Sequence, residues 1–277
     1  MAQDGSGLSV RFWGVRGSIP APGIETLRYG GDTTCIEIRA EGRLFVIDSG
    51  SGARRLGLHM QEIGEAEADL FYTHFHFDHI CGLPFFCPAM NPDFSIRCWA
   101  GHYETSGEFV AAIENLMSPP IFPVDTSVLA GCSFQVFERG KDMVFGNSVR
   151  LRTIPLNHPG GATGYRFEFG DKSVSIITDH EHGDAAIDSA VLDFVEGTDI
   201  MVYDAMFDDA KYEKHVGWGH STWQKCLEIA TAANVKLPIV FHHDHMVDDD
   251  GLDAIGRQVE ERFPGALVAR EGLELTA

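Results

Sequence analysis

The chain is short of basic residues. Of its 277 residues, 21 are lysine or arginine and 41 are aspartate or glutamate, which gives a formal net charge of −20. Proteins that bind long nucleic acids normally display a basic patch, because neutralising phosphates supplies much of the binding energy. The composition therefore argues against a long RNA or DNA substrate and favours a small molecule.

The sequence also lacks a long hydrophobic run. No stretch approaches the roughly eighteen uninterrupted apolar residues of a membrane-spanning helix, so no membrane span is expected. Residues 1–9 are polar and lack the basic region followed by an apolar region that marks a secretory signal. These absences predict a cytoplasmic protein.

Cysteines are few and scattered. None of the six falls in the C-x-x-C spacing of a zinc knuckle or a dithiol redox site, so free buried thiols are expected. Cys81 lies two residues beyond His79 and could approach a site formed there, but packing in the core is the favoured interpretation.

Apolar residues make up 44% of the chain, which is enough to bury a sizeable core. We expect one domain over residues 1–277, because no linker or internal repeat divides the sequence. Strand patterns alternate with amphipathic helix patterns. Strands are predicted over residues 9–14, 35–38, 43–48, 70–72, 95–100, 133–138, 149–154, 165–169, 174–178, 199–203 and 237–241, and helices over 53–64, 104–117 and 249–263, from near 80, and after 222.

The centre of the chain is residues 71–79, FYTHFHFDH, in which four metal-competent side chains fall within six residues. Burying this many polar groups beside a phenylalanine-rich strand is costly unless a partner satisfies them, which predicts a metal site. At the end of the strand, His74 and His76 are expected to point to one side because side chains alternate. Asp78 and His79 are expected at the turn into a helix that starts near Ile80, aimed at a second point. The pattern allows one ion or two adjacent ions.

The H-x-H-x-D-H pattern resembles the signature of the metallo-β-lactamase fold hydrolases. The resemblance implies an α/β fold, an αββα sandwich of two mixed β-sheets flanked by helices. It also implies that His158, just past a predicted strand, is the third histidine of a first metal site, and that Asp179 bridges two sites. Asp48 matches an aspartate that orients the metal-binding loop, and a carboxylate does this well by anchoring the second nitrogen of a ligating imidazole.

The last ligand is expected at the end of the strand over residues 237–241. His242 matches the family's second-site ligand, whereas His243 would point to the opposite side of the strand, so His242 is favoured over His243. The predicted set then comprises a first site, a second site and a bridge: His74, His76 and His158; Asp78, His79 and His242; and Asp179. Nitrogen and oxygen ligands without thiolate suit two zinc ions, with manganese or iron as alternatives.

Two such cations lower the pKa of a bridging water and polarise an electrophile, so hydrolysis is the expected reaction. His220 lies in a Gly-His-Ser-Thr element that resembles the proton-donating element of RNase Z and its relatives. Phosphodiester cleavage leaves an alkoxide that needs a proton, which His220 is suited to supply as general acid. We therefore assign His220, Asp78 and Asp48 to the catalytic set.

The predicted function is a phosphodiesterase that acts on a small phosphodiester such as a 3',5'-cyclic nucleotide. A glycine-rich loop over residues 14–23 favours this function, because it resembles a loop that borders the active site in phosphodiesterase-type members of the family. A hydrolase of a lactone, thioester or lactam is an alternative, and a diiron redox or sensor protein is another. The resemblance is also compatible with a homodimer.

Residues 118–124 form a proline-rich apolar segment. Its three prolines remove backbone donors and fix φ, so no helix or strand is expected there. Such a segment either packs on the core or covers a pocket as a lid, and the sequence leaves both possibilities open.

Overall fold

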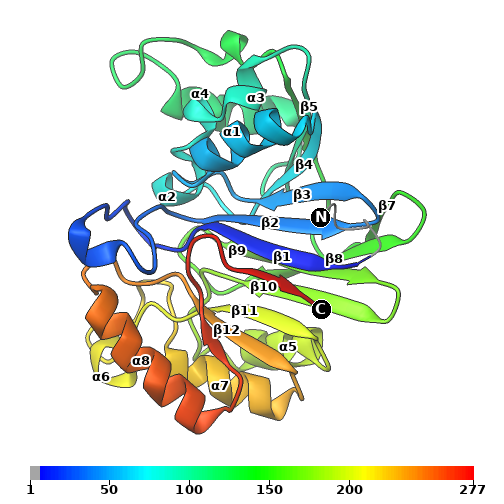
Figure 1. Cartoon of the computed structure of the whole chain (residues 1–277). Coiled ribbons are helices and arrows are strands. Elements are labelled where there is room, and N and C mark those ends of the chain that lie inside the picture. The colour runs from blue at the N-terminus through cyan, green and yellow to red at the C-terminus, as the bar shows by residue number, and fades with distance from the viewer. Residues whose placement is uncertain (1–6) are drawn as a thin grey trace.

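Two seven-stranded sheets pack face to face in the computed structural model, which describes residues 7–277 (Figure 1). Most of the segment examined for a secretory signal, residues 1–6, therefore lies outside the described part. The first sheet has the order β14-β1-β2-β3-β4-β5-β6. Its strands are β1 Ser9–Gly14, β2 Cys35–Ala40, β3 Arg43–Ile47, β4 Glu67–Tyr72, β5 Ser95–Ala100, β6 Cys132–Val136 and β14 Glu274–Thr276.

The second sheet has the order β13-β12-β11-β10-β9-β8-β7. Both sheets are mixed, because each contains three antiparallel and three parallel pairings. Its strands are β7 Met143–Phe145, β8 Val149–Leu156, β9 Ala162–Phe169, β10 Lys172–Ile177, β11 Ile200–Asp204, β12 Leu237–Phe241 and β13 Leu267–Val268.

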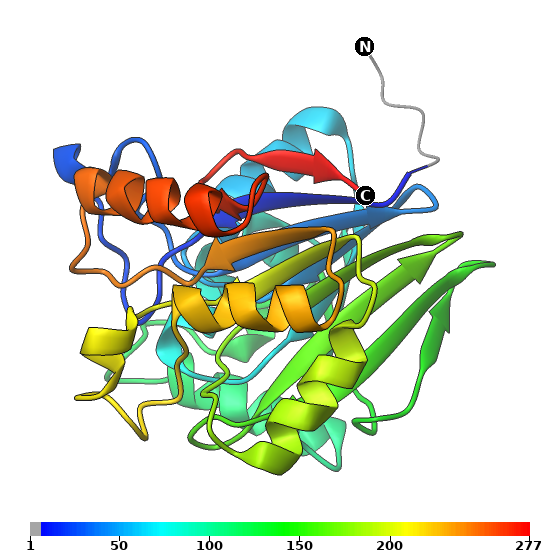
Figure 2. The ribbon, with the colours of Figure 1, turned by 90° about the horizontal axis from the view of Figure 1, so that it is seen from below.

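Helices cover the outer face of each sheet. Over the first sheet lie α1 Ala53–Ile63, α3 Cys87–Met90 and α4 Ser106–Leu116 (Figure 1). Figure 2 shows α5 Ala185–Val195, α7 Trp223–Ala232 and α8 Asp249–Arg262 on the outer face of the second sheet. The short helices α2 Phe77–Ile80 and α6 Asp209–Tyr212 lie in loops, as do three 3-10 turns, Ile24–Thr26, Leu83–Phe85 and Thr126–Val128. This is the predicted αββα sandwich, and no helix among residues 7–277 has the length and apolar character needed to cross a membrane.

The strands are apolar on both sides because both faces of each sheet are covered. In β3, Phe45 and Ile47 pack in the core between the sheets, whereas Leu44 and Val46 pack under the outer helices. In β12, Ile239 belongs to the inner core, and its neighbour Val240 faces the outer helices. Each such side chain stabilises the fold by about 1.5–3 kcal/mol when fully buried.

Two expectations about the residues next to the central motif are wrong. The helix expected to start near Ile80 instead spans Phe77–Ile80, so Asp78 lies inside it. β4 ends at Tyr72 as predicted, but His74 and His76 lie in the loop beyond it, so strand alternation does not place them. In the segment 118–124, Phe122 packs against Phe85 with ring centroids 5.8 Å apart, while Ile121 is 73% exposed.

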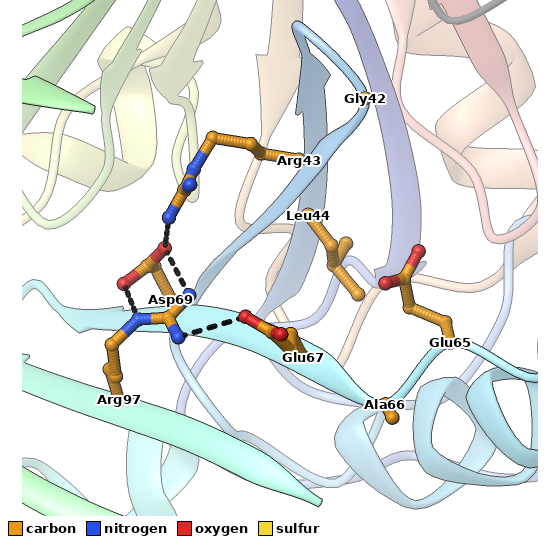
Figure 3. A pocket seen from close by; sticks show the side chains of 8 residues that line it. All are labelled: Gly42, Arg43, Leu44, Glu65, Ala66, Glu67, Asp69 and Arg97. Carbon is orange, nitrogen blue, oxygen red and sulfur yellow. Dashed lines mark hydrogen bonds and ion pairs between the residues drawn. The ribbon is translucent and has the colours of Figure 1, made fainter. Parts of the chain in front are cut away.

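A charged network ties three strands together at the amino-terminal end of β4 (Figure 3). Asp69 Oδ1 accepts from Arg97 Nε at 2.6 Å and from Trp99 Nε1 at 3.0 Å, and its Oδ2 accepts from Arg43 Nη2 at 3.0 Å. The network borders a cavity of about 380 Å³. It lies at the end of the strand opposite the loop that carries His74.

Replacing Asp69 with asparagine should lower the free energy of unfolding at pH 7 by about 1–3 kcal/mol, because two partly buried guanidinium groups lose their charged partner. Burial raises the pKa of Asp69, but hydrogen bonds from Arg97, Trp99 and Arg43 outweigh it and hold that pKa below 3.8. The stabilisation is therefore complete above the unfolded pKa and is lost as the pH falls through the folded one.

Urea unfolding from pH 7 to pH 3 measures the free energy of unfolding of wild type and of Asp69→Asn. The difference between them should shrink below about pH 4, near the ordinary aspartate pKa. The exposed neighbour Glu67 provides a control, because Glu67→Gln should change stability by less than about 1 kcal/mol. A difference between wild type and Asp69→Asn that is constant with pH would contradict the assignment.

Candidate metal centre

Seven predicted ligands converge at one edge of the sandwich, although they come from separate segments. Each segment follows the carboxyl end of a strand: β4 leads to His74, His76 and α2; β8 leads to His158; β10 leads to Asp179; and β12 leads to His242. All seven side chains are buried except that of His76. Their ligand-type atoms form groups in which every atom lies within 4.8 Å of the others.

The first group consists of His74, His76 and His158. His158 Nε2 lies 3.0 Å from His76 Nδ1, and the rings of His74 and His158 have centroids 4.6 Å apart. Burial and neighbouring imidazoles lower the pKa of both His74 and His76. They are therefore held in the neutral form that binds a metal.

The second group consists of Asp78, His79 and His242. Asp78 Oδ2 lies 3.3 Å from His79 Nε2 and 3.7 Å from His242 Nε2. Burial alone would raise the pKa of Asp78, but His79 and His242 lower it overall, so this carboxylate is ionised.

Asp179 lies between the two groups. Its Oδ1 is 3.8 Å from the Nε2 atoms of both His74 and His158, and 3.3 Å from His242 Nε2. Its Oδ2 is 3.2 Å from His79 Nε2. One carboxylate thus reaches both groups with its two oxygens, which is the position of a bridging ligand.

The residues fit a pair of cations. The Nε2 atoms of His74, His79 and His242 are buried, and none has a hydrogen-bond partner among residues 7–277. Three such nitrogens in one place are costly unless something satisfies them. A set of imidazoles and carboxylates without thiolate is typical of zinc sites, and it also accepts manganese or iron.

The second ring nitrogen of each buried imidazole is anchored by the protein, which turns Nε2 towards the centre. His79 Nδ1 lies 2.7 Å from Asp48 Oδ2, and His158 Nδ1 lies 2.8 Å from the Gly219 carbonyl oxygen. His74 Nδ1 lies 3.1 Å from Thr73 Oγ1, and His242 Nδ1 lies 3.2 Å from Thr34 Oγ1.

Asp48 also holds the loop after β4. Its carboxylate accepts from the Thr73 backbone N–H at 2.8 Å and from the Thr73 hydroxyl at 2.7 Å. Burial raises the pKa of Asp48, although His79 and Thr73 oppose the shift. Asp48 thus supports one imidazole and the backbone from which two further ligands extend.

Three strand-end residues have a left-handed backbone: Asp48 at φ 61°, Asp179 at φ 59° and His242 at φ 62°. This conformation is uncommon outside glycine and turns the chain sharply. At β12 the turn brings His242 into the site, while His243 Nε2 lies 2.7 Å from the Ala269 carbonyl oxygen, away from the ligand groups. The geometry therefore favours His242 over His243.

His220 lies directly beside the second group. Its ring stacks on that of His242 at 5.1 Å, and its Nδ1 lies 2.8 Å from Asp204 Oδ2. Burial alone would lower the pKa of His220, but Asp204 and the more distant Asp179 raise it to about 9. Thr222 caps α7, as its hydroxyl accepts from the Lys225 N–H.

Asp204 is a site residue that the sequence analysis did not single out. It is fully buried at the end of β11, and its carboxylate accepts from the backbone N–H groups of Asp179 at 3.1 Å and Ser221 at 3.0 Å, in addition to the contact with His220. The available signal was its position at the end of an apolar strand, the same position that Asp48 and Asp179 occupy.

Glu181 is a second residue without an assigned role in the sequence. Its buried carboxylate accepts from the backbone N–H groups of Gly217 at 2.6 Å and Gly219 at 2.7 Å. Gly219 has φ 89°, and a Cβ there would lie only 2.2 Å from His158 Nδ1. Glu181 thus fixes Gly219 in place. The carbonyl oxygen of Gly219 contacts His158, and the next residue in the chain is His220.

The glycine-rich loop over residues 14–23 borders the site. The Ser18 N–H donates to Asp78 Oδ2 at 2.8 Å, and a Cβ on Gly17 would lie 2.6 Å from His242 Nε2. His180 and Cys81 belong to none of the ligand groups formed by residues 7–277: His180 lies 3.4 Å from Asp188, and Cys81 Sγ lies 3.7 Å from the Thr33 hydroxyl.

Known proteins are similar to this chain in sequence and in fold. The family model described as Beta-lactamase superfamily domain matches residues 43–243. Ribonuclease Z of Gemmatimonas aurantiaca is 23% identical over 317 residues, covering 97% of this chain and 95% of its own. The metallo-β-lactamase fold protein YhfI from Bacillus subtilis has a TM-score of 0.75 at 15% identity, covering 98% of this chain and 100% of its own. A diphosphatase from the PhnP family has a TM-score of 0.68 at 19% identity, covering 97% of each chain.

Replacing Asp48 with asparagine should weaken metal binding by about 10- to 100-fold, because His79 loses its anionic anchor. Competition with a chromophoric chelator measures the affinity of the purified protein for Zn²⁺. Asp199 is a matched control. It is also buried and accepts from a backbone N–H, that of Ser173, but it lies at the end of β11 opposite Asp204. If Asp199→Asn weakened zinc binding as much as Asp48→Asn, a specific role for Asp48 would be excluded.

Proposed function

The chain belongs to the β-lactamase superfamily and is a hydrolase of the metallo-β-lactamase fold, and from this premise we propose that it uses two divalent cations to cleave a phosphodiester. The proposed substrate is a small phosphodiester such as a 3',5'-cyclic nucleotide. The observation that carries the proposal is the convergence of seven metal-competent side chains, three of them with an unpartnered buried nitrogen.

The first cation would be held by His74, His76 and His158, and the second by Asp78, His79 and His242, with Asp179 shared between them. When bound, a pair of cations would lower the pKa of a bound water so that hydroxide is available as nucleophile, polarise the phosphoryl group and neutralise developing charge. Zinc is the proposed resident metal. Asp48 acts through His79, whose ring it orients.

His220 is the proposed general acid. Cleavage of a phosphodiester by water breaks the bond between phosphorus and the leaving oxygen, and the departing alkoxide needs a proton. Asp204 holds His220 Nδ1 at 2.8 Å, which leaves Nε2 as the atom that can deliver that proton. A hydrolase of lactams or lactones has less need of this element.

The relatives support phosphate chemistry. A ribonuclease matches the chain over nearly its whole length, and one structural neighbour is a diphosphatase. The match to ribonuclease Z also makes RNA a second candidate substrate, in contrast to the expectation from composition. The net charge of −20 remains the physical argument for a small substrate.

A substrate panel tests the reaction class. We expect the zinc-loaded protein to cleave bis-p-nitrophenyl phosphate and 3',5'-cyclic AMP, to lose this activity with EDTA and to regain it when Zn²⁺ is restored. A homoserine lactone and a cephalosporin should be turned over at least about 100-fold more slowly, a difference of about 2.7 kcal/mol in transition-state binding.

A precursor tRNA in the same panel separates the two phosphate substrates. If the precursor were cleaved far more efficiently than cyclic AMP, the small-substrate proposal would be replaced by the ribonuclease one. Turnover of the lactone or the cephalosporin alone would remove both. Iron content and visible absorbance of protein purified without oxygen test the diiron alternative.

The variant His220→Ala should lower kcat by about 10²- to 10⁴-fold, because the leaving group is no longer protonated by a positioned acid. Zinc content, measured by mass spectrometry, should stay at the wild-type level, since His220 is not among the proposed ligands. His245→Ala alters a partly exposed histidine three residues after His242 and should leave kcat unchanged. Wild-type turnover by His220→Ala would end the general-acid assignment.

A further inference from the structure

We propose that a pocket beside the metal centre binds the base of a nucleotide substrate. The pocket has a volume of about 760 Å³ and is lined by residues 101–104 and 136–139 and by Pro155. This volume falls in the range of small-molecule sites. The proposal rests on the proposed phosphodiesterase function and adds the substrate class: nucleotides rather than phosphodiesters in general.

The pocket lies along the same edge of the sandwich as the ligands. In the first sheet, Tyr72 at the end of β4 pairs with Ala100 at the end of β5, which pairs with Val136 at the end of β6. The pocket residues follow β5 and β6 as His74 follows β4. Ligands bind at the carboxyl ends of parallel strands in α/β sheets, so the pocket continues the metal centre sideways.

Two segments that carry histidines of the metal centre also border the pocket. Phe75 lies between His74 and His76 in the sequence, and its ring is 5.1 Å from that of Tyr103 and 6.0 Å from that of His102. On the other side, the Gly161 N–H donates to the His158 carbonyl oxygen at 2.8 Å.

Arg139 lies beside the second of these segments, which contains His158 and Gly161. A Cβ on Gly161 would lie 3.6 Å from Arg139 Nη1, so the guanidinium borders the loop that carries His158. A substrate with its phosphate at the centre therefore has the pocket directly beside it.

The pocket offers a rigid aromatic surface. The Tyr103 ring is held by Phe75 at 5.1 Å and stacks on Phe109 at 6.1 Å with an interplanar angle of 17°. Phe109 is fully buried, so the platform beneath Tyr103 is fixed. Stacking on such a ring suits any nucleobase, because every base has a π-face.

Two polar side chains, His102 and Arg139, line the pocket. Both ring nitrogens of His102 are buried, and neither forms a hydrogen bond of normal geometry with residues 7–277. Burial and Arg139 lower the pKa of His102 to about 4, although the Gly161 backbone opposes the shift, so the ring is neutral. Arg139 has no carboxylate partner among the same residues, which leaves its guanidinium donors for acceptors on the base.

The test compares two substrates with the same cyclic phosphodiester: 3',5'-cyclic AMP and methyl ribofuranoside 3',5'-cyclic phosphate, which has no base. Wild type should prefer the nucleotide in kcat/KM by about 10-fold or more, the range expected for one stacked base. Tyr103→Ala should remove most of this preference by raising KM for cyclic AMP, while kcat/KM for the base-free compound stays unchanged.

Two further variants keep the test independent of folding. Tyr103→Phe retains the ring and should behave as wild type. Arg139→Ala alters an exposed side chain and should weaken the binding of cyclic AMP, but not of the base-free compound, by about three-fold or more. This factor corresponds to the loss of one typical hydrogen bond. Equal losses for both substrates in Tyr103→Ala, or no preference in wild type, would overturn the proposal.

Equilibrium binding separates this proposal from the proposed function. Titration calorimetry of zinc-loaded protein with AMP needs no turnover, and Tyr103→Ala should bind AMP about 10-fold more weakly than wild type. If AMP binding depends on Tyr103 but no phosphodiester is cleaved, the pocket stands and the phosphodiesterase function falls. If phosphodiesters are cleaved but Tyr103→Ala binds AMP as tightly as wild type, only the pocket assignment is wrong.

Discussion

The carboxylate of Asp179 is the constraint on which the site depends. It is buried and lies within 3.8 Å of imidazole nitrogens from five different residues, so it cannot move without disturbing all of them. The αββα sandwich makes this possible, because loops from the ends of strands in both sheets meet at one edge. The same packing places a second layer of anchors, with Asp48 on one sheet and Asp204 on the other.

The fold could be predicted because its strands carry a strong signal. A run such as Leu44 to Ile47, apolar at every position, is typical of a strand covered on both faces. Ligand identity was predictable for a different reason: the side chains of the central motif lie close in the sequence, and the resemblance extends them to His158, Asp179 and His242. The end of β3 was predicted one residue too late, at Asp48 instead of Ile47, because the left-handed backbone of Asp48 ends the strand before this residue.

The residues that the sequence did not assign share one property. Asp204 contacts His220 16 positions away, and Glu181 contacts Gly219 38 positions away. Neither lies in a motif with a fixed spacing, so only the folded chain brings out its role. The start of α2 at Phe77 was missed for a local reason: a four-residue helix has too few positions to show a helical period.

Gly219 joins the two halves of the chemistry in one peptide unit. Its N–H is held by Glu181, its carbonyl oxygen meets His158, and the next residue is His220. A shift of this single link would loosen a metal-holding imidazole and misplace the proton donor at the same time. The orientation of one metal-binding imidazole and the position of the proposed acid therefore depend on the same peptide unit.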